Sequence, residues 1–100
     1  NEEVKVLSTR DNKMIILDDR NGSVSIRYSD GTFITLKGDG IQIHSAGYLH
    51  LRASGNISLT ADGSMSIKAD EQIILGCKES EFLLTPDGIA MNGTDIKINE

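Results

Sequence analysis

Two histidines, one cysteine and scattered aspartates are the side chains of this sequence whose chemistry suits metal binding or catalysis. His44 and His50 stand six residues apart, each next to an apolar residue in a run where apolar and polar residues alternate. Alternate residues of a strand point to opposite faces, so both histidines would face outward without converging on one metal ion. We therefore interpret both as solvated surface residues.

The single cysteine, Cys77, cannot form an intrachain disulfide, so the sequence lacks the disulfide framework of a small secreted scaffold. Cys77 takes the position that Ala53, Ala61 and Ala69 hold in three preceding segments of the same apolar pattern. That position favours a small core side chain over a metal or redox site.

The acidic residues are better explained by turns than by catalysis. Asp18-Asp19 precedes Arg20-Asn21-Gly22, which is a turn sequence. Asp62, Asp70 and Asp87 also follow or form turns, and they lack the GGxGxD pattern of calcium-binding β-rolls. Serines are plentiful, but neither histidine is placed to act as the base of a catalytic triad. We predict no catalytic residue, no metal site and no cofactor.

The composition indicates a chain that gains its core by association. Aromatic residues make up 4% of the sequence, there is no Trp, and the apolar share is 38%, which is low for a self-sufficient domain of 100 residues. The net charge of −5 is dispersed, which argues against nucleic-acid binding. No apolar run approaches the ~20 residues of a membrane span. The sequence starts at Asn1 without Met, and we interpret it as a piece of a longer protein.

The apolar residues define a repeat of eight residues. From Gly47 the sequence runs GYLHLRAS, GNISLTAD, GSMSIKAD and EQIILGCK, and residues 39–46 fit the same pattern. The third and fifth places are apolar and the seventh is small: Leu49, Leu51 and Ala53; Ile57, Leu59 and Ala61; Met65, Ile67 and Ala69; Ile73, Leu75 and Cys77. Because even spacing places side chains on one face of a strand, each unit is predicted to be a short strand with one dry and one wet face.

Related strands and turns flank the repeats. Candidate strands cover residues 4–7, 13–17 and 24–28, and the turn sequences Lys37-Gly38-Asp39-Gly40 and Thr85-Pro86-Asp87-Gly88 separate apolar pairs of equal spacing. No helix is expected, because apolar residues do not recur at three–four spacing. We divide the chain into N-terminal strands that form a neck, residues 1–31, and a needle, residues 32–100, whose regular core spans 39–78.

The length of the repeat favours a threefold object. A single-chain β-solenoid would need three such units per coil, about 24 residues. A strict repeat of eight suits three chains wound around one axis, with each unit hydrogen-bonded to units of the other two chains. The predicted fold is therefore all-β, a triple-stranded intertwined β-helix (β-prism) formed by an obligate homotrimer.

The predicted dry face gathers the apolar residues of the alternating segments. Outside the repeats they are Ile15, Leu17, Val24, Ile26, Ile34, Leu36, Ile41, Ile43, Phe82, Leu84, Ile89, Met91, Ile96 and Ile98. A lone chain would leave most of them in water and would expose unpaired strand edges.

The run GIQIHSAGYLHLRASGNISLTADGSMSIKAD resembles the β-helical needle of VgrG spike proteins of type VI secretion systems and the related tail spikes of contractile phages. NKMIILDD, GTFITLKGDGIQI and FLLTPDGIAMNGTDIKIN resemble the stretches that flank that needle, so the resemblance covers roughly residues 5–99.

The resemblance implies a homotrimeric needle that a contractile tube drives through a target cell envelope. It implies assembly in the bacterial cytoplasm followed by injection, or a place in a phage-like particle. Tube and base proteins would be contacted through N-terminal domains missing here, and the target membrane only transiently. The blunt end of such needles seats a PAAR-repeat tip protein, which points to Ile96, Lys97, Ile98 and Asn99. The HxH iron site of some phage spikes has no counterpart in this sequence.

Three hypotheses follow from the sequence. The first is a cell-puncturing spike, and the second is a passive trimeric stalk of a fibre or adhesin. The third, an enzymatic or sugar-binding tailspike, is weak because such a groove needs paired carboxylates and exposed aromatic residues, and only Phe33, Phe82, Tyr28 and Tyr48 are aromatic.

Overall fold

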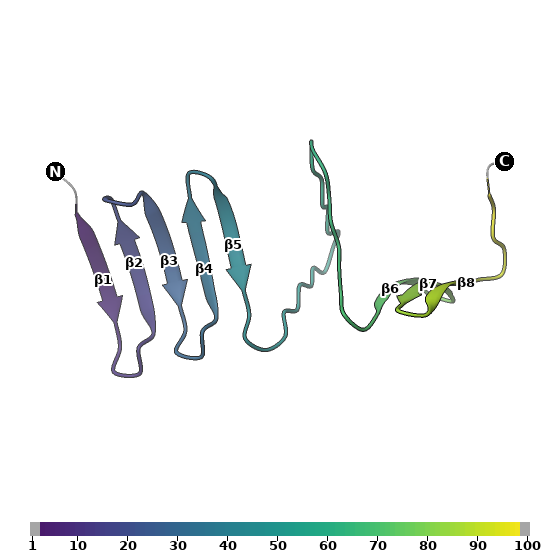
Figure 1. Cartoon of the computed structure of the whole chain (residues 1–100), viewed down its shortest axis with the longest axis horizontal. Coiled ribbons are helices and arrows are strands. Elements are labelled where there is room, and N and C mark those ends of the chain that lie inside the picture. The colour runs from purple at the N-terminus through teal and green to yellow at the C-terminus, as the bar shows by residue number, and fades with distance from the viewer. Residues whose placement is uncertain (1–2, 99–100) are drawn as a thin grey trace. The chain divides into compact units, whose positions relative to one another are not determined.

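The computed structural model describes residues 3–98, and this part of the chain is all-β, as predicted. It contains two antiparallel sheets and no helix (Figure 1). The strands are β1 (Val4–Ser8), β2 (Met14–Asp18), β3 (Ser23–Arg27), β4 (Phe33–Lys37), β5 (Gly40–His44), β6 (Ile73–Cys77), β7 (Ser80–Thr85) and β8 (Gly88–Asn92). The three candidate N-terminal strands are confirmed to within a few residues at their ends.

The first sheet is a meander in which strands β1 to β5 lie side by side in sequence order (Figure 1). Each strand pairs antiparallel with the next, and the register places Ile15 opposite Ile26 and Ile34 opposite Ile43. Alternating apolar and polar residues suit such a half-covered strand, because β-branched side chains pack well on a pleated face. The meander therefore puts alternate residues of all five strands on one common face.

Two hairpins share the same two-residue turn. Gly38 and Asp39 connect β4 to β5, and Pro86 and Asp87 connect β7 to β8. The next residue is a glycine with positive φ in both cases, 152° at Gly40 and 154° at Gly88, where an L side chain would be strained. The equal spacing of apolar pairs across both turn sequences is thus confirmed as equal hairpin register.

The second sheet, β6–β7–β8, is a shorter meander. Ile73 pairs with Leu84 and Leu75 with Phe82, and β7 pairs in turn with β8. The connection between β6 and β7 contains Lys78 and Glu79, and Lys78 adopts a positive φ of 55°. This turn begins at the final residue of the last repeat and reverses the chain.

Between the two sheets in sequence, the chain is extended and belongs to no strand. Residues 46–72 are all exposed, and two-residue bends fall at 46–47, 54–55, 62–63 and 70–71, eight residues apart. The predicted boundaries between repeats are therefore confirmed. We define residues 47–70, the three units between these bends, as the octad run.

The pairing of the repeats differs from the expectation at both ends. All five units were expected to pair with other chains, but the first forms β5 against β4 and the last forms β6 against β7. The tight turns at Gly38-Asp39 and Lys78-Glu79 supply a neighbouring strand from the same chain. The three units of the octad run have no strand partner among residues 3–98.

The predicted division into neck and needle falls at residues 31 and 32, in the turn between β3 and β4 of one sheet. The contacts within the chain divide it into two compact units. The boundary between them falls between Ile57 and Ser58 in the sequence, inside the octad run. The neck and needle remain a prediction about the assembled molecule.

Replacing Gly40 by alanine should destabilise the first sheet, because a residue forced into a sparsely populated backbone region costs roughly 1–3 kcal/mol. Gly38→Ala is the matched control in the same turn, since no atom lies within 4 Å of its Cβ position and its φ is not positive. Urea denaturation of both variants measures the difference. An equal loss of stability in the two would contradict the turn geometry.

Candidate functional site

The most distinctive surface of the first sheet is a continuous aliphatic face. The strand register aligns its side chains in two rows that cross the strands, and we name them together the ladder face. One row is Leu7, Ile15, Ile26, Ile34 and Ile43, and the other is Leu17, Val24, Leu36 and Ile41. Lys5 continues the second row at β1, opposite Leu17. Eight of these nine residues were predicted to face inward, and the structure brings all eight onto one face.

The ladder face is uncovered in the single chain. Its residues range from 37% exposed at Ile34 to 70% at Ile41, and no hydrophobic side chain among residues 3–98 is buried. Full burial of one such side chain contributes roughly 1.5–3 kcal/mol. Contiguous exposed apolar patches are uncommon on monomeric soluble proteins.

The opposite face of β3, β4 and β5 is polar and carries its own contacts. Ser25 is 4% exposed, and its Oγ lies 3.4 Å from the Thr35 Oγ1. At one end of this face the Arg27 guanidinium lies 5.6 Å from the centre of the Phe33 ring, which stacks on His44 with ring centres 5.4 Å apart. These contacts fix aromatic and cationic side chains on the wet face, as cation–π and stacking contacts do at exposed sites.

Two residues therefore behave differently from the sequence interpretation. His44 faces outward as predicted, but it stacks on Phe33 rather than standing free in solvent. Leu7 joins the ladder face although it was not predicted to face inward. Its place in the 4–7 segment gave the signal, but without the β1–β2 register the direction of its side chain was undetermined.

The second sheet repeats the division into an apolar and a mixed face. We define its C-terminal apolar face by the residues that the register aligns on one side: Ile73, Leu75, Phe82, Leu84, Ile89 and Met91. Leu75, Ile89 and Met91 are exposed. Cys77 lies on the same side, opposite Ser80, as its spacing from Ile73 and Leu75 predicts, and it is also exposed in the single chain; its inward place in a trimer stays a prediction.

The octad run lacks both burial and pairing within the chain. The six apolar residues at the third and fifth places of its units are 54–71% exposed: Leu49, Leu51, Ile57, Leu59, Met65 and Ile67. No backbone hydrogen bond between described residues involves the segment 49–72. The contacts at its start belong to the preceding bend: the Ser45 hydroxyl donates to the Tyr48 carbonyl at 2.9 Å, and the Ala46 N–H donates to the Thr32 Oγ1 at 3.0 Å. His50 lies in this run, apart from the His44 stack.

The C-terminal segment holds the residues predicted to bind a tip protein. Ile96, Lys97 and Ile98 are extended and belong to no strand, with Ile96 50% and Ile98 75% exposed. Asn99 lies outside the described residues. Ile96 lines a concavity of about 380 Å³ together with Leu75, Phe82 and Met91, so it lies beside the C-terminal apolar face.

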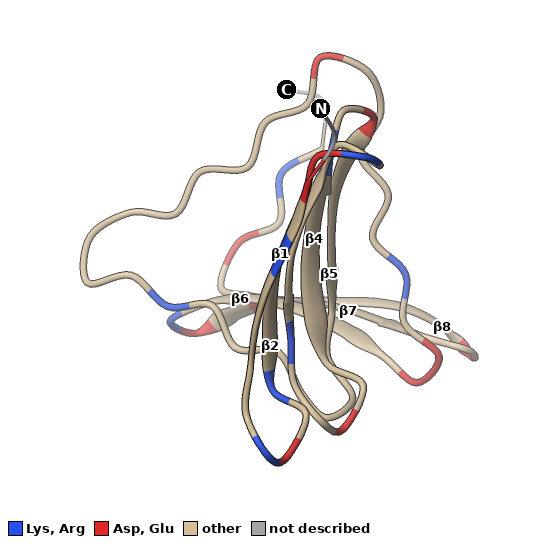
Figure 2. Cartoon of the chain, turned by 90° about the vertical axis from the view of Figure 1, so that its left-hand side faces the viewer, with Lys and Arg blue, Asp and Glu red and all other residues tan. Residues whose placement is uncertain are grey.

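Charged side chains are concentrated in turns and extended segments, where Figure 2 shows most of the blue and red. Those inside the described strands are Lys5, Asp18, Arg27, Lys37 and Glu81. No cluster of three or more metal-ligating side chains occurs between residues 3 and 98. Nor does that stretch contain a helix long and apolar enough to cross a membrane.

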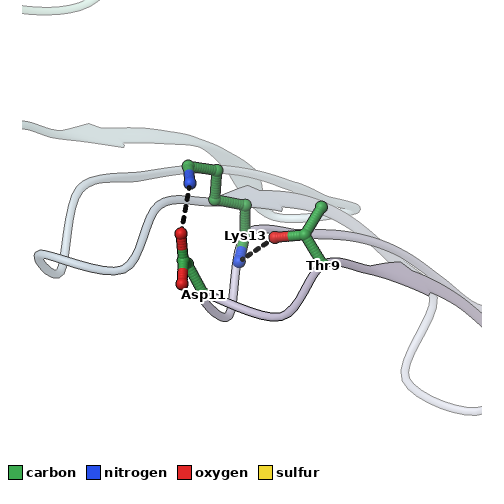
Figure 3. Close-up of polar contacts among 3 residues, drawn as sticks. All are labelled: Thr9, Asp11 and Lys13. Carbon is green, nitrogen blue, oxygen red and sulfur yellow. Dashed lines mark hydrogen bonds and ion pairs between the residues drawn. The ribbon is translucent and has the colours of Figure 1, made fainter.

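Short polar contacts order the turns of the first sheet. In the β1–β2 turn the Lys13 backbone N–H donates to the Thr9 Oγ1 at 3.3 Å, and the Lys13 Nζ lies 3.5 Å from Asp11 (Figure 3). Such an exposed ion pair contributes little by itself. The turn therefore rests mainly on its hydrogen bonds, including the bond from the Thr9 N–H to the Lys13 carbonyl at 3.0 Å.

Two aspartates accept hydrogen bonds that favour their charged form. The Asn21 backbone N–H donates to the Asp18 carboxylate at 3.1 Å and its side-chain amide donates at 2.9 Å, and these bonds lower the pKa of Asp18. The Thr32 N–H donates to Asp30 at 2.9 Å and lowers the pKa of Asp30 in the same way. Both carboxylates thus close turns of the first sheet.

Acid should loosen the turn at Asp18. A carboxyl with a lowered pKa in the folded state adds stability above its unfolded pKa and loses it as the pH falls through its folded pKa. We expect the Asn21 amide resonance to shift as the pH falls below about 4, the ordinary value for aspartate. In the Asp18→Asn variant the Asn21 amide should keep the same chemical shift across that pH range. A change of equal size in the variant would assign the effect to another titrating group.

No protein-family model and no curated protein matches this chain. The two apolar faces, the octad run and the C-terminal segment are therefore the features on which a function is argued.

Proposed function

We propose that this chain is one of three identical subunits of an intertwined β-helix, which forms the rigid spike of a contractile injection machine. The observation that carries the proposal is the octad run: three units of eight residues, regularly bent, apolar on alternate places and unpaired within their own chain. The proposed role of the chain is structural and not catalytic.

The extended backbone of the octad run is costly in conformational entropy. Holding one residue in a single extended conformation costs roughly 1–2 kcal/mol of conformational entropy. Among residues 3–98 the segment 49–72 makes no backbone hydrogen bond, and its aliphatic side chains stay 54–71% exposed, so little offsets that cost. Strands from other chains, lying on both sides of each unit, would supply both.

The dimensions of one repeat favour a particular number of sides for the proposed coil. The first and last repeats form strands of five residues, β5 and β6, so one side of the coil is about 17 Å long at ~3.4 Å per residue. Three such sides place the axis about 5 Å from each side, half the ~10 Å that separates packed sheets. Leucine and isoleucine side chains fill that distance.

A four-sided coil fits less well. Four sides of the same length would put the axis about 8.5 Å from each side and leave a channel that aliphatic side chains do not fill. The dimensions of a five-residue side thus favour three sides over four. Because the octad run has no strand partner among residues 3–98, we assign the three sides of each layer to three chains.

The proposed assembly is suited to a mechanical role. In the proposed arrangement each layer is hydrogen-bonded to the next along the axis at ~4.8 Å spacing, which makes a narrow rod stiff under end-on load. The resemblance of residues 5–99 to VgrG needles supports use as an envelope-puncturing spike. By the same analogy the spike is assembled in the bacterial cytoplasm, joins tube and base proteins through N-terminal domains, and carries a PAAR-type tip at Ile96–Asn99.

A charge in the octad run should abolish the trimer. Leu59→Asp places three carboxylates in the dry interior of the proposed coil, whereas Thr60→Asp, the matched control, places them on its outer face. We expect sedimentation and native mass measurements to give a trimer for the parent and for Thr60→Asp, and an unassembled chain for Leu59→Asp. A compact monomeric parent chain would refute the assembly.

The mechanical role is tested separately on the assembled trimer. A spike should bind a PAAR-type tip protein at its C-terminal end, and binding should weaken in a Lys97→Glu variant that leaves the trimer intact. A trimer that binds neither a tip protein nor a tube base would instead be a passive stalk of a fibre or adhesin.

A further inference from the structure

The mixed face of the second sheet, opposite its C-terminal apolar face, also carries apolar side chains. The register places Ile74 opposite Leu83 and Leu83 opposite Ala90, so these three residues cross β6, β7 and β8 on one side, and we name them the outer row. Ile74 is 51% exposed and Leu83 is half-buried. Among residues 3–98, strands contact only their neighbours in the same sheet, so no strand covers the outer row.

The two compact units of the chain differ in net charge. Residues 1–57 contain seven acidic and seven basic residues, whereas residues 58–100 contain eight acidic and three basic residues. The individual charges are dispersed along the sequence, but the net charge of −5 therefore belongs entirely to the second unit. A surface of one sign attracts partners of the opposite sign and repels partners of its own.

Acidic side chains lie at both ends of the strands that carry the outer row. At one end Glu79 is in the β6–β7 turn, and Glu81 points to the same side of β7 as Leu83, two residues later. At the other end Asp87 is in the β7–β8 turn, and the acidic pair at 70–71 shares a concavity with that turn. Figure 2 shows acidic segments in red at both ends of this sheet.

These carboxylates make no contact that would explain them within the described chain. Four carboxylates between residues 3 and 98 accept a hydrogen bond or form an ion pair, and all four lie in the first unit: Glu3, Asp11, Asp18 and Asp30. The acidic residues at 70, 71, 79, 81 and 87 do neither. Their charges are therefore available to a partner, whereas those of Asp18 and Asp30 serve the turns of the first sheet.

We infer that the mixed face of β6–β8 binds an extended segment of another protein, with apolar residues in its middle and Lys or Arg at both ends. The apolar middle covers the outer row, and the basic ends reach the two acidic ends of the sheet. The six residues of β7 separate those ends by about 20 Å at ~3.4 Å per residue. Nucleic acids and anionic membranes do not suit this face, because they carry the same sign of charge.

This surface goes beyond the proposed spike. The proposed trimer encloses the C-terminal apolar face, on the other side of the same sheet, and the tip protein is placed at Ile96–Asn99. The outer row therefore stays on the outside of the assembly, where a second protein can be carried along its flank.

A synthetic peptide tests the inference on the full chain. The probe has two lysines at each end of the sequence Leu-Ser-Leu-Ser-Leu, and titration calorimetry measures its Kd and stoichiometry. We expect one peptide per chain. Binding should be at least about tenfold tighter than that of two control peptides, one with glutamates in place of the lysines and one with serines in place of the leucines. Absence of binding, or equal binding of the serine peptide, would overturn the inference.

Matched variants locate the site. Glu81→Gln combined with Asp87→Asn removes one charge from each end of the sheet and should weaken binding of the probe at least about fivefold. Asp19→Asn combined with Asp39→Asn removes the same charge from turns of the first sheet and should leave the Kd unchanged. Ile74→Ser should also weaken binding at least about fivefold. Equal effects of the two charge pairs would show attraction to net charge alone, and the inference would be wrong.

Sedimentation of the same samples separates this inference from the proposed function. A monomeric chain that binds the probe at the mixed face would refute the trimer and leave the inference standing. A trimer that does not bind the probe would refute the inference and leave the trimer standing.

Discussion

A strand is stable only when its backbone groups are paired and its apolar face is covered, and no described part of this chain meets both conditions by itself. The meanders β1–β5 and β6–β8 pair their own backbones but leave the ladder face and the C-terminal apolar face open to solvent. The segment 49–72 leaves its backbone unpaired as well. The low aromatic content fits this division, because a narrow interior shared between chains holds Leu, Ile, Val and Ala more readily than large rings.

Turns decide which of the two solutions each strand takes. Where a glycine with positive φ follows a two-residue turn, at Gly40 and Gly88, the chain reverses and pairs with itself. Gly47, Gly55 and Gly63 stand in the bends of the octad run without positive φ, and there the chain turns a corner and continues extended. The dipeptide Asp-Gly occurs in both settings, at Asp87-Gly88 and Asp62-Gly63, so the dipeptide alone does not select the outcome. What differs is the backbone conformation of the glycine, whose φ is positive at Gly88 and not at Gly63.

That difference also marks the limit of prediction from the sequence. Period-two alternation identified eight of the nine ladder-face residues and the octad boundaries, because both depend only on local spacing. It did not separate repeats that pair within the chain from those that do not, because pairing depends on the turns at Gly38-Asp39 and Lys78-Glu79, at the two ends of the run of repeats. The stack of Phe33 on His44 was missed for the same reason: the two residues meet only once the β4–β5 register is known. The alternation of apolar and polar residues is weakest at the N-terminal edge of the first sheet. There the face of β1 and β2 opposite the ladder face also carries apolar residues: Val4, Val6, Met14 and Ile16.

The order of the segments suggests how an intertwined molecule of this kind could assemble correctly. Hairpins with loops of two to five residues close within microseconds and need no partner. The two meanders can therefore fix their register in each chain before chains meet, which limits the slippage to which a repetitive strand sequence is prone. The octad run has no such local contacts, so in the proposed trimer it orders only when three preformed sheets hold three runs at the same height. Once wound, each run is held by two others, and separation requires all three to open together, which makes loss of the assembly slow rather than merely unfavourable. In the proposed trimer, the sheet before the octad run in sequence and the sheet after it thus act as clamps on a segment that has no contacts to set its own register.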